Sequence, residues 1–208
     1  LALAAGGVEF ALSGGHLGGS RLARQLKVGR IEPGQGLACL DLLRAAGART
    51  HLIVSRAAEL TLKDELGLSL ADIAPRADVL HAGKNIGATV ASGSFKARGM
   101  ILAPCSVKTL AEIATGTTST LLSRAADVTL KERRRLVLMV RESPLHLGHL
   151  RAMVQATEMG AIIAPPVLCF YAKLQSLEDM VNYSVARALD LLGFDIEIPR
   201  WQGLGSGR

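Results

Sequence analysis

The sequence predicts a three-layer α/β/α protein with a doubly wound, mostly parallel sheet, on the basis of three observations. First, the apolar runs 99–104 and 136–140 are continuous rather than alternating, which is typical of parallel strands buried on both faces. Second, segments with helical spacing alternate with strands along the chain, so helices are expected on both faces of the sheet. Third, the chain has 208 residues, of which 49% are hydrophobic and only 3% aromatic. This composition suits a single compact domain, 1–208, with an aliphatic core, and two small domains are the less favoured alternative.

Charge and cysteine content narrow the possible functions. The formal net charge is +6, but the basic residues are scattered except at 131–135. No aromatic stacking platform accompanies that run, so nucleic acid is not expected as a partner. The run is interpreted either as a solvated face or as a basic lining for a phosphorylated small molecule. The cysteines lack zinc-binding spacing, which predicts no metal and a reducing, cytoplasmic location; they are Cys39, Cys105 and Cys169. No apolar run reaches the length of a membrane span, and residues 1–7 lack the basic region of a secretory signal.

The N-terminal part is predicted to form a strand at 8–12, a glycine-rich turn at 13–20 and a basic helical segment at 21–26. Together these elements form a plausible phosphate cradle, since glycine lets the backbone approach an anion and a helix start offers free N–H groups. An ordinary turn is the alternative. A breaker-rich loop then leads to a helix at 37–46, which ends at Gly47. The residues expected in the cradle are Ser13, Gly14 and Gly15.

Ser55 ends the next strand, 50–55, and precedes a helix at 56–65. In a parallel sheet this is a position on the ligand side. A serine there is equally typical of a helix N-cap, and both interpretations stay open. Short helical turns at 69–73 and a short strand at 78–81 follow.

The stretch from Pro104 to Arg141 carries the polar residues best suited to a site, because they lie at the ends of buried strands, where open α/β sheets bind ligands. Ser106 and Thr109 begin a helix one turn apart, so both hydroxyls can face one anion or ring edge. A simple N-cap at Ser106 is the alternative. Arg141 and Glu142 directly follow the second buried strand and are better placed for a site than for solvation alone.

The last part of the chain completes the alternation of helices and strands. His146 and His149 have a spacing that two metal ligands can share, but no third ligand is evident, so polar helix residues are favoured. Ser176 is expected as the N-cap of the last helix, with Asp179 completing a weak capping box. Residues 199–208 are expected to form a tail. The remaining predicted elements are helices at 107–114, 121–126, 146–159 and 176–192 and a strand at 161–164.

Several motifs between residues 37 and 203 occur in a specific order. They are Ser92-Gly93-Ser94-Phe95, Pro104-Cys105-Ser106-x-Lys108-Thr109-Leu110, Leu122-x-Arg124-Ala125-Ala126-Asp127-Val128, Leu130-Lys131-Glu132-Arg133-Arg134, Val140-Arg141-Glu142-x-Pro144-Leu145-His146, Gly160-Ala161-x-Ile163-x-Pro165-Pro166 and Phe170-Tyr171. Together they resemble the UbiX-type flavin prenyltransferases, also known as the phenylacrylic or aromatic-acid decarboxylase family. Seven motifs in one order are far more specific than any one of them.

The resemblance implies a flavodoxin-like or Rossmann-like subunit in a large homo-oligomer, commonly a dodecamer, that binds FMN and requires no metal. The implied reaction transfers the dimethylallyl group of dimethylallyl monophosphate to N5 of reduced FMN and closes a ring at C6. The prenylated FMN would serve a partner decarboxylase of the UbiD type, in ubiquinone synthesis or in the breakdown of aromatic acids.

The resemblance also implies roles for individual residues. Glu142 would assist proton movement, while Lys131 and Arg141 would stabilise the negative charge that builds on the leaving phosphate. Glu65 would reach the site of a neighbouring subunit. The implied phosphate ligands are Lys131, Tyr171 and Arg187. The implied FMN contacts, besides the N-terminal cradle, are Ser55, Ser106, Val107, Lys108, Thr109, Arg124 and Arg141.

The N-terminal region departs from the family pattern, which reads Ser/Thr-Gly-Ala-Ser-Gly-Ala-x-Tyr-Gly and continues directly into the helix that begins here at Leu37. Aligned from Ser13, the family's second serine, which takes part in proton transfer, falls on His16. Aligned backward from Leu37, the pattern falls on 30–36 instead. We interpret the three residues from Ser13 as the surviving cradle, within an atypical region at 1–36. An FMN-binding paralogue with impaired turnover is therefore the alternative function.

Overall fold

The computed structural model describes residues 34–203 and, for the backbone only, residues 8–13. Its centre is a six-stranded sheet with the order β3-β2-β1-β4-β5-β6. The strands are β1 (Val8–Ser13), β2 (Arg49–Val54), β3 (Val79–His81), β4 (Ala97–Cys105), β5 (Arg135–Val140) and β6 (Ala161–Ile163). The α-helices are α1 (Gln35–Ala45), α2 (Arg56–Leu66), α3 (Leu70–Ile73), α4 (Val107–Ala114), α5 (Leu121–Lys131), α6 (Leu147–Glu158) and α7 (Leu177–Asp190).

The sheet is mostly parallel, as the sequence predicts. β2 pairs in parallel with β3, β4 with β5, and β5 with β6. The exception is β1, which is antiparallel to both of its neighbours, β2 and β4. The carboxyl ends of the parallel strands therefore meet at one edge of the sheet, which we call the carboxyl edge; the opposite edge is the amino edge. In open α/β sheets, ligands bind at the carboxyl edge, where the strand order reverses.

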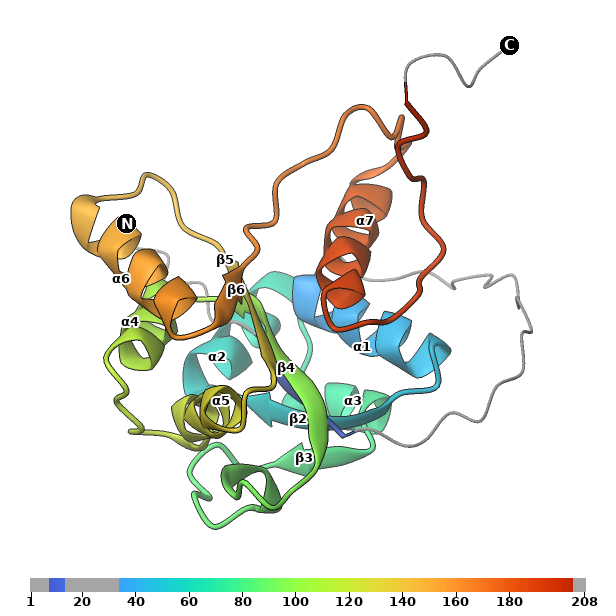
Figure 1. Ribbon diagram of the computed structural model, residues 1–208. Coiled ribbons are helices and arrows are strands. Elements are labelled where there is room, and N and C mark those ends of the chain that lie inside the picture. The colour runs from blue at the N-terminus through green and yellow to red at the C-terminus, as the bar shows by residue number, and fades with distance from the viewer. Residues whose placement is uncertain (1–7, 14–33, 204–208) are drawn as a thin grey trace.

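Helices cover both faces of the sheet (Figure 1). On one face, α1, α2, α3 and α7 pack against a core that includes Ile101 and Ala103 of β4. On the other face, α4, α5 and α6 pack against a core that includes Met100 and Leu102. Consecutive residues of β4 thus alternate between two cores, and all four are fully buried. This burial on both sides is the reason why the strand is a continuous apolar run in the sequence.

Polar side chains fix the first residues of the helices. The hydroxyl oxygens of Ser55 and Ser106 cap α2 and α4. The predicted capping box of α7 is confirmed, since Ser176 Oγ accepts from the Asp179 N–H and the Asp179 carboxylate accepts from the Ser176 N–H. Gly67, with φ of 67°, ends α2 in the left-handed region that favours glycine.

Most of the predicted elements are confirmed to within a few residues. The helix predicted at 37–46 begins two residues earlier, at Gln35, and the helical segment predicted at 121–126 continues to Lys131. The helix predicted at 21–26 lies outside the described residues. In the described ranges, no helix combines the length and the apolar character needed to cross a membrane.

Candidate functional site

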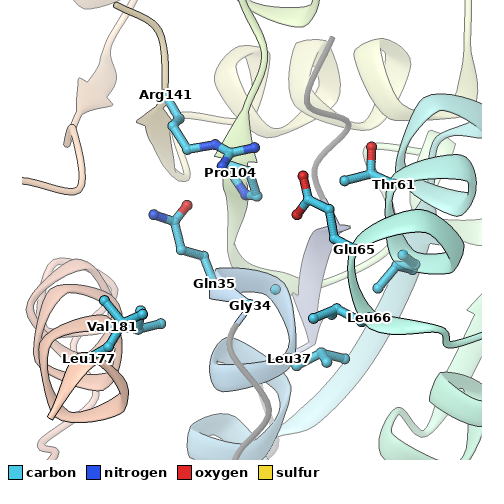
Figure 2. Close-up of a pocket in the computed structure, with 12 residues that line it drawn as sticks. Gly34, Gln35, Leu37, Thr61, Glu65, Leu66, Pro104, Arg141, Leu177 and Val181 are labelled. Carbon is cyan, nitrogen blue, oxygen red and sulfur yellow. The ribbon is translucent and has the colours of Figure 1, made fainter. Parts of the chain in front are cut away.

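A cleft of about 220 Å³ opens at the carboxyl edge, bordered by α1, α2, α7, the end of β4 and the segment that follows β5 (Figure 2). It lies near the reversal of strand order, where the fold predicts a ligand site. Its lining residues are Gly34, Gln35, Gly36, Leu37, Thr61, Leu62, Glu65, Leu66, Pro104, Arg141, Leu177 and Val181. Of the site residues predicted from the sequence, Arg141 and Glu65 belong to this set.

Three polar side chains converge in the cleft from different elements (Figure 2). The Arg141 guanidinium enters from the segment after β5, the Gln35 amide from the first turn of α1, and the Glu65 carboxylate from the end of α2. None of the ion pairs among the described residues includes Arg141 or Glu65. Both charges therefore remain available to a ligand. Glu65, expected at the site of a neighbouring subunit, lines the cleft of its own subunit.

The helix α1 directs its N-terminus into the cleft. Its N-cap, Gly34, makes no side-chain capping hydrogen bond, and the first intrahelical bond runs from the Ala38 N–H to the Gly34 oxygen at 2.9 Å. The N–H groups of the first turn, from Gln35 to Leu37, therefore have no partner within the helix and favour an anionic group. The apolar pattern of the sequence predicts the first turn at Leu37, two residues after the helix begins. The glycines on either side of Gln35 were the sequence feature that could have indicated the earlier helix start.

Apolar side chains form the remaining walls of the cleft. Leu62 and Leu66 contribute from α2, and Leu177 and Val181 contribute from α7. Apolar walls with a few convergent polar groups are typical of small-molecule and cofactor sites. The cleft therefore suits a ligand with an apolar body, polar atoms and an anionic group.

The predicted hydroxyl ligands serve as helix caps. Ser55 Oγ accepts from the Ala58 N–H at 3.2 Å, and Ser106 Oγ accepts from the Thr109 N–H at 3.2 Å. Because capping uses the oxygen only as an acceptor, the hydroxyl proton can still be donated to a ligand. The hydroxyl oxygens of Ser106 and Thr109 lie 3.1 Å apart, so one donates to the other and one proton remains for a ligand. The N-cap interpretation is thus confirmed for both serines, and it leaves room for the ligand role.

Three other predicted FMN contacts lie on helix surfaces. Val107 and Lys108 form the first turn of α4, where Lys108 Nζ lies 3.8 Å from the Glu112 carboxylate. Arg124 of α5 donates to the Asp127 carboxylate at 2.7 Å. None of the three lines the cleft. Their predicted role therefore depends on ligand atoms that extend beyond the cleft.

Glu142 lies in the exposed segment between β5 and α6. Its Oε1 accepts from the Ser143 N–H at 3.0 Å. The single subunit does not bury this carboxylate, although the predicted proton carrier depends on a shielded environment. In the same segment, His146 caps α6, with Nδ1 accepting from the Gly148 N–H at 3.0 Å. This contact agrees with the predicted role of His146 as a polar helix residue.

The predicted phosphate ligands fall into two separate groups, and the first lies on and beside α7. The hydroxyl oxygens of Tyr171 and Tyr183 lie 2.7 Å apart. Arg187, one helical turn beyond Tyr183, forms an ion pair with Asp190. Asp190 also accepts from Arg200 at 2.8 Å, which ties the C-terminal segment to α7.

Two pKa values in this group are shifted. The hydrogen bond with Tyr171, followed by burial, raises the pKa of Tyr183 above its ordinary value, so the Tyr183 hydroxyl keeps its proton. Burial tends to raise the pKa of Asp190, but hydrogen bonds from Arg200 and Arg187 outweigh it and hold this pKa below its ordinary range. Asp190 therefore stays ionised between its two arginines.

Lys131 forms the second group, at the amino edge. It ends α5, shortly before β5 begins at Arg135, whereas Arg141 follows the opposite end of β5. Six residues of strand separate these two ends by about 20 Å. The prediction that Lys131 and Arg141 surround one phosphate is therefore wrong within a single subunit. Lys131 instead pairs with Glu132, next to the backbone of Gly93.

The structure also places the predicted cradle residue Ser13 away from the cleft. Because β1 is antiparallel to its neighbours, Ser13 pairs with Arg49 of β2 and Ala97 of β4, which lie at the amino edge. The prediction required a first strand that ends at the carboxyl edge, and β1 runs in the opposite direction. Gly14 and Gly15 lie outside the described residues.

The cleft fits the cofactor that the sequence resemblance implies. The first turn of α1 and the Arg141 guanidinium suit an anionic phosphate, and the apolar walls suit a flavin ring. Gln35 adds a buried side-chain oxygen that has no hydrogen-bond partner in the described part of the chain. A bound ligand with a free N–H or O–H would satisfy this oxygen. FMN carries donors of both kinds.

Comparisons with known proteins agree with this assignment. Residues 35–189 match the family model Flavoprotein. The chain is 51% identical to Flavin prenyltransferase UbiX of Neisseria meningitidis over 170 residues, which cover 81% of this chain and 90% of that protein. It is also 51% identical to Flavin prenyltransferase UbiX of Escherichia coli K12 over 174 residues, which cover 81% and 91% of the two chains.

Solved structures show the same architecture. The crystal structure of AnUbiX (PadA1) in complex with FMN and dimethylallyl pyrophosphate matches with a TM-score of 0.78 and 47% identity, covering 82% of this chain and 91% of that one. A dodecameric FMN-dependent UbiX-like decarboxylase from Escherichia coli O157:H7 matches with a TM-score of 0.78 and 44% identity, covering 84% and 96%.

Proposed function

The chain belongs to the UbiX family of flavin prenyltransferases, and from this premise we propose that it transfers a dimethylallyl group from dimethylallyl monophosphate to reduced FMN. The observation that carries the proposal is the cleft at the carboxyl edge, where Arg141, the first turn of α1 and apolar walls meet. The solved relative that binds both FMN and a dimethylallyl phosphate ester supports this choice of ligands.

Residues at the carboxyl edge would hold the cofactor. FMN, when bound, supplies the N5 and C6 atoms that form bonds to the dimethylallyl carbons. The hydroxyls of Ser55, Ser106 and Thr109 would donate to its polar atoms, and Arg141 would neutralise negative charge beside it. The apolar walls would exclude water from the ring.

The phosphate ligands would stabilise the leaving group. When the bond between the allylic carbon and the phosphate oxygen breaks, the electron pair leaves with the oxygen, and negative charge builds there. Lys131 and Arg187 would offset this charge, and Tyr171 would donate a hydrogen bond to it. Glu142 would carry the proton that N5 or C6 releases when its new bond to carbon forms.

We further propose that these groups meet between subunits of a homo-oligomer. About 20 Å separates the two ends of β5, so Lys131 of one subunit would serve the Arg141 cleft of another. Exposed apolar side chains on α6 support such an assembly, because they need a protein partner to be buried; they are Leu147, Leu150 and Val154. The solved dodecameric relative supports the same arrangement, and we propose a dodecamer here.

Mass spectrometry of flavin extracted after incubation with reduced FMN and dimethylallyl monophosphate tests the proposed function. The expected result is a flavin heavier by one isoprene unit, with release of one phosphate. A parallel incubation with dimethylallyl diphosphate determines which ester the protein uses. Recovery of unmodified FMN with both esters would contradict the proposal.

An FMN-binding paralogue with impaired turnover is the second candidate. The observation that favours it is the departure of the N-terminal region from the family pattern, because neither the alignment from Ser13 nor the alignment backward from Leu37 places a serine at the family's proton-transferring position. This candidate predicts FMN binding without formation of prenylated FMN. Wild-type turnover would exclude it.

The product would serve a UbiD-type decarboxylase, and we propose a cytoplasmic location. Prenylated FMN is useful only to an enzyme that binds it, so transfer to such a partner is the expected fate. Support for the location comes from the cysteine pattern, which is typical of a reducing compartment.

A further inference from the structure

Gln35 has no role in the site predicted from the sequence, yet it occupies a central place in the cleft. It is the first residue of α1, and its amide points into the same space as the Arg141 guanidinium and the Glu65 carboxylate (Figure 2). Aligned backward from Leu37, Gln35 falls where the family pattern has tyrosine. A carboxamide offers a carbonyl acceptor and two N–H donors, so it can recognise groups that a phenol cannot pair with in the same way.

The carbonyl oxygen of this amide needs a donor that no residue in the described part of the chain supplies. Gln35 Oε1 is buried, and no described residue donates a hydrogen bond to it. A buried acceptor that is cut off from water and unpaired is unfavourable, and native proteins rarely keep one without a reason. Since the amide lines the cleft, the missing donor is best supplied by a ligand.

We propose that Gln35 is a specificity-determining residue for FMN, with Oε1 accepting a hydrogen bond from the uncharged part of the cofactor. The donors there are the ring N–H groups and the ribityl hydroxyls. The ionised phosphate carries only acceptors, so it would repel this oxygen and lie instead against the first-turn N–H groups of α1 and Arg141. The proposal rests on the proposed function only for the choice of FMN as the ligand.

The test compares Gln35→Met with Gln175→Met in the full-length protein. Methionine has nearly the same length as glutamine but neither accepts nor donates strongly, so Q35M removes the acceptor and keeps the volume. Gln175 is exposed, and its Nε2 donates to the Lys173 oxygen outside the cleft, so Q175M controls for the substitution itself. The measurements are FMN affinity by quenching of flavin fluorescence and the Tm of the cofactor-free protein.

For Q35M, FMN affinity is expected to fall without any loss in the Tm of the cofactor-free protein. FMN should bind about tenfold more weakly, as for the loss of one buried hydrogen bond. The Tm of the cofactor-free protein should stay constant or rise, because an unpaired buried amide has been removed. Q175M should bind FMN as the wild type does. Gln35→Glu, which keeps an acceptor, should retain riboflavin binding.

Binding of riboflavin and lumiflavin, which lack the phosphate and the whole ribityl phosphate chain, respectively, shows which part of FMN contacts Gln35. Q35M should lose affinity for riboflavin and FMN equally, and a loss that extends to lumiflavin places the donor on the ring rather than on the ribityl chain. Unchanged FMN affinity in Q35M, a loss confined to FMN, or a lower Tm of the cofactor-free Q35M protein would each overturn the proposal. Wild-type protein that binds FMN without forming product contradicts the proposed function alone and leaves this test intact.

Discussion

At the residue scale, Ser106 caps α4 and is also proposed to contact FMN, whereas Thr120 caps a helix without any proposed ligand role. Ser106 Oγ caps α4 at the carboxyl edge, and Thr120 Oγ1 caps α5 in the same way by accepting from the Ser123 N–H. Ser106→Ala and Thr120→Ala should each lower the free energy of unfolding by about 1 kcal/mol, as for the loss of an N-cap. Only S106A should also weaken FMN binding, by about fivefold.

Denaturant unfolding and FMN titration of both variants check this expectation. Equal weakening of FMN binding by T120A would mean that cap loss, not the missing hydroxyl donor, reduces the affinity. Full FMN affinity in S106A would remove this serine from the cofactor site.

The histidine pair of β2 and β3 predicts a loss of stability in acid. His51 Nδ1 and His81 Nε2 lie 2.9 Å apart, and Phe95 packs edge-on against His51. Burial, with the neighbouring His81 and Arg49, lowers the pKa of His51 despite the opposing Asp78, and burial lowers the pKa of His81. The unfolded chain therefore binds protons first as the pH falls below about 6.5, and the free energy of unfolding falls with it.

Tm measured between about pH 7 and pH 5 follows this linkage. His81→Gln should show a shallower decline than the wild type. An unchanged slope in H81Q would disprove the assignment to this pair.

Residues in a local pattern were predictable, and residues joined only by the fold were not. Ser106 and Thr109 were correctly brought together because helical spacing alone places them one turn apart. Lys131 and Arg141 do not meet within one subunit, because a whole strand lies between them and carries them to opposite edges of the sheet. Gln35 was missed because a glutamine beside glycines gives no chemical signal until a cleft surrounds it.

At the scale of elements, Gly99 shows how closely β4 approaches its neighbours. A Cβ there would lie 2.6 Å from the Arg135 oxygen of β5 and 2.8 Å from Leu192 Cδ2, beyond α7. Gly99→Ala should therefore lower the free energy of unfolding by about 1–3 kcal/mol, the usual range for overpacking. Urea denaturation measures this loss.

Gly87 provides the comparison for that substitution. It lies in an exposed loop, and an added Cβ would meet only Asn85 Oδ1, at 3.5 Å. Gly87→Ala should change the stability by only a few tenths of a kcal/mol or raise it slightly. Equal losses in the two variants would show that glycine replacement itself, rather than the close approach at β4, is responsible.

The sequence predicts that β1 is a strand but does not predict its direction in the sheet. The apolar residues at 8–12 predict a strand correctly, since strand propensity is local. Whether that strand runs parallel or antiparallel to its neighbours depends on pairing with β2 and β4, which are distant in sequence. The position of a cradle that follows the strand depends on the direction of the strand. Because β1 is antiparallel to its neighbours, Ser13 lies at the amino edge.

At the scale of the whole molecule, sites shared between subunits predict complementation. Lys131→Ala and Arg141→Ala should each abolish product formation. Mixed oligomers of the two variants should recover activity, because random assembly leaves about a quarter of the sites with both wild-type residues. The measurement is prenylated FMN formed by co-expressed variants.

Separately purified oligomers that are mixed without subunit exchange serve as the control and should stay inactive. Inactive mixed oligomers, with assembly shown by sedimentation, would mean that Lys131 and Arg141 do not act in one composite site. Lys131 at the amino edge and Arg141 at the carboxyl edge would then belong to separate sites.

The ion pairs of Asp190 would affect how phosphate binds at the proposed Arg187 site. Because Asp190 already pairs with Arg187 and Arg200, a phosphate bound at the proposed Arg187 site would have to displace this carboxylate. Asp190 would remain beside the bound phosphate, and the repulsion between the two anions would make binding weaker than to an unpaired arginine. The same carboxylate would pair with Arg187 again when the product phosphate departs, so the residue that competes with the substrate would also restore the site for the next one.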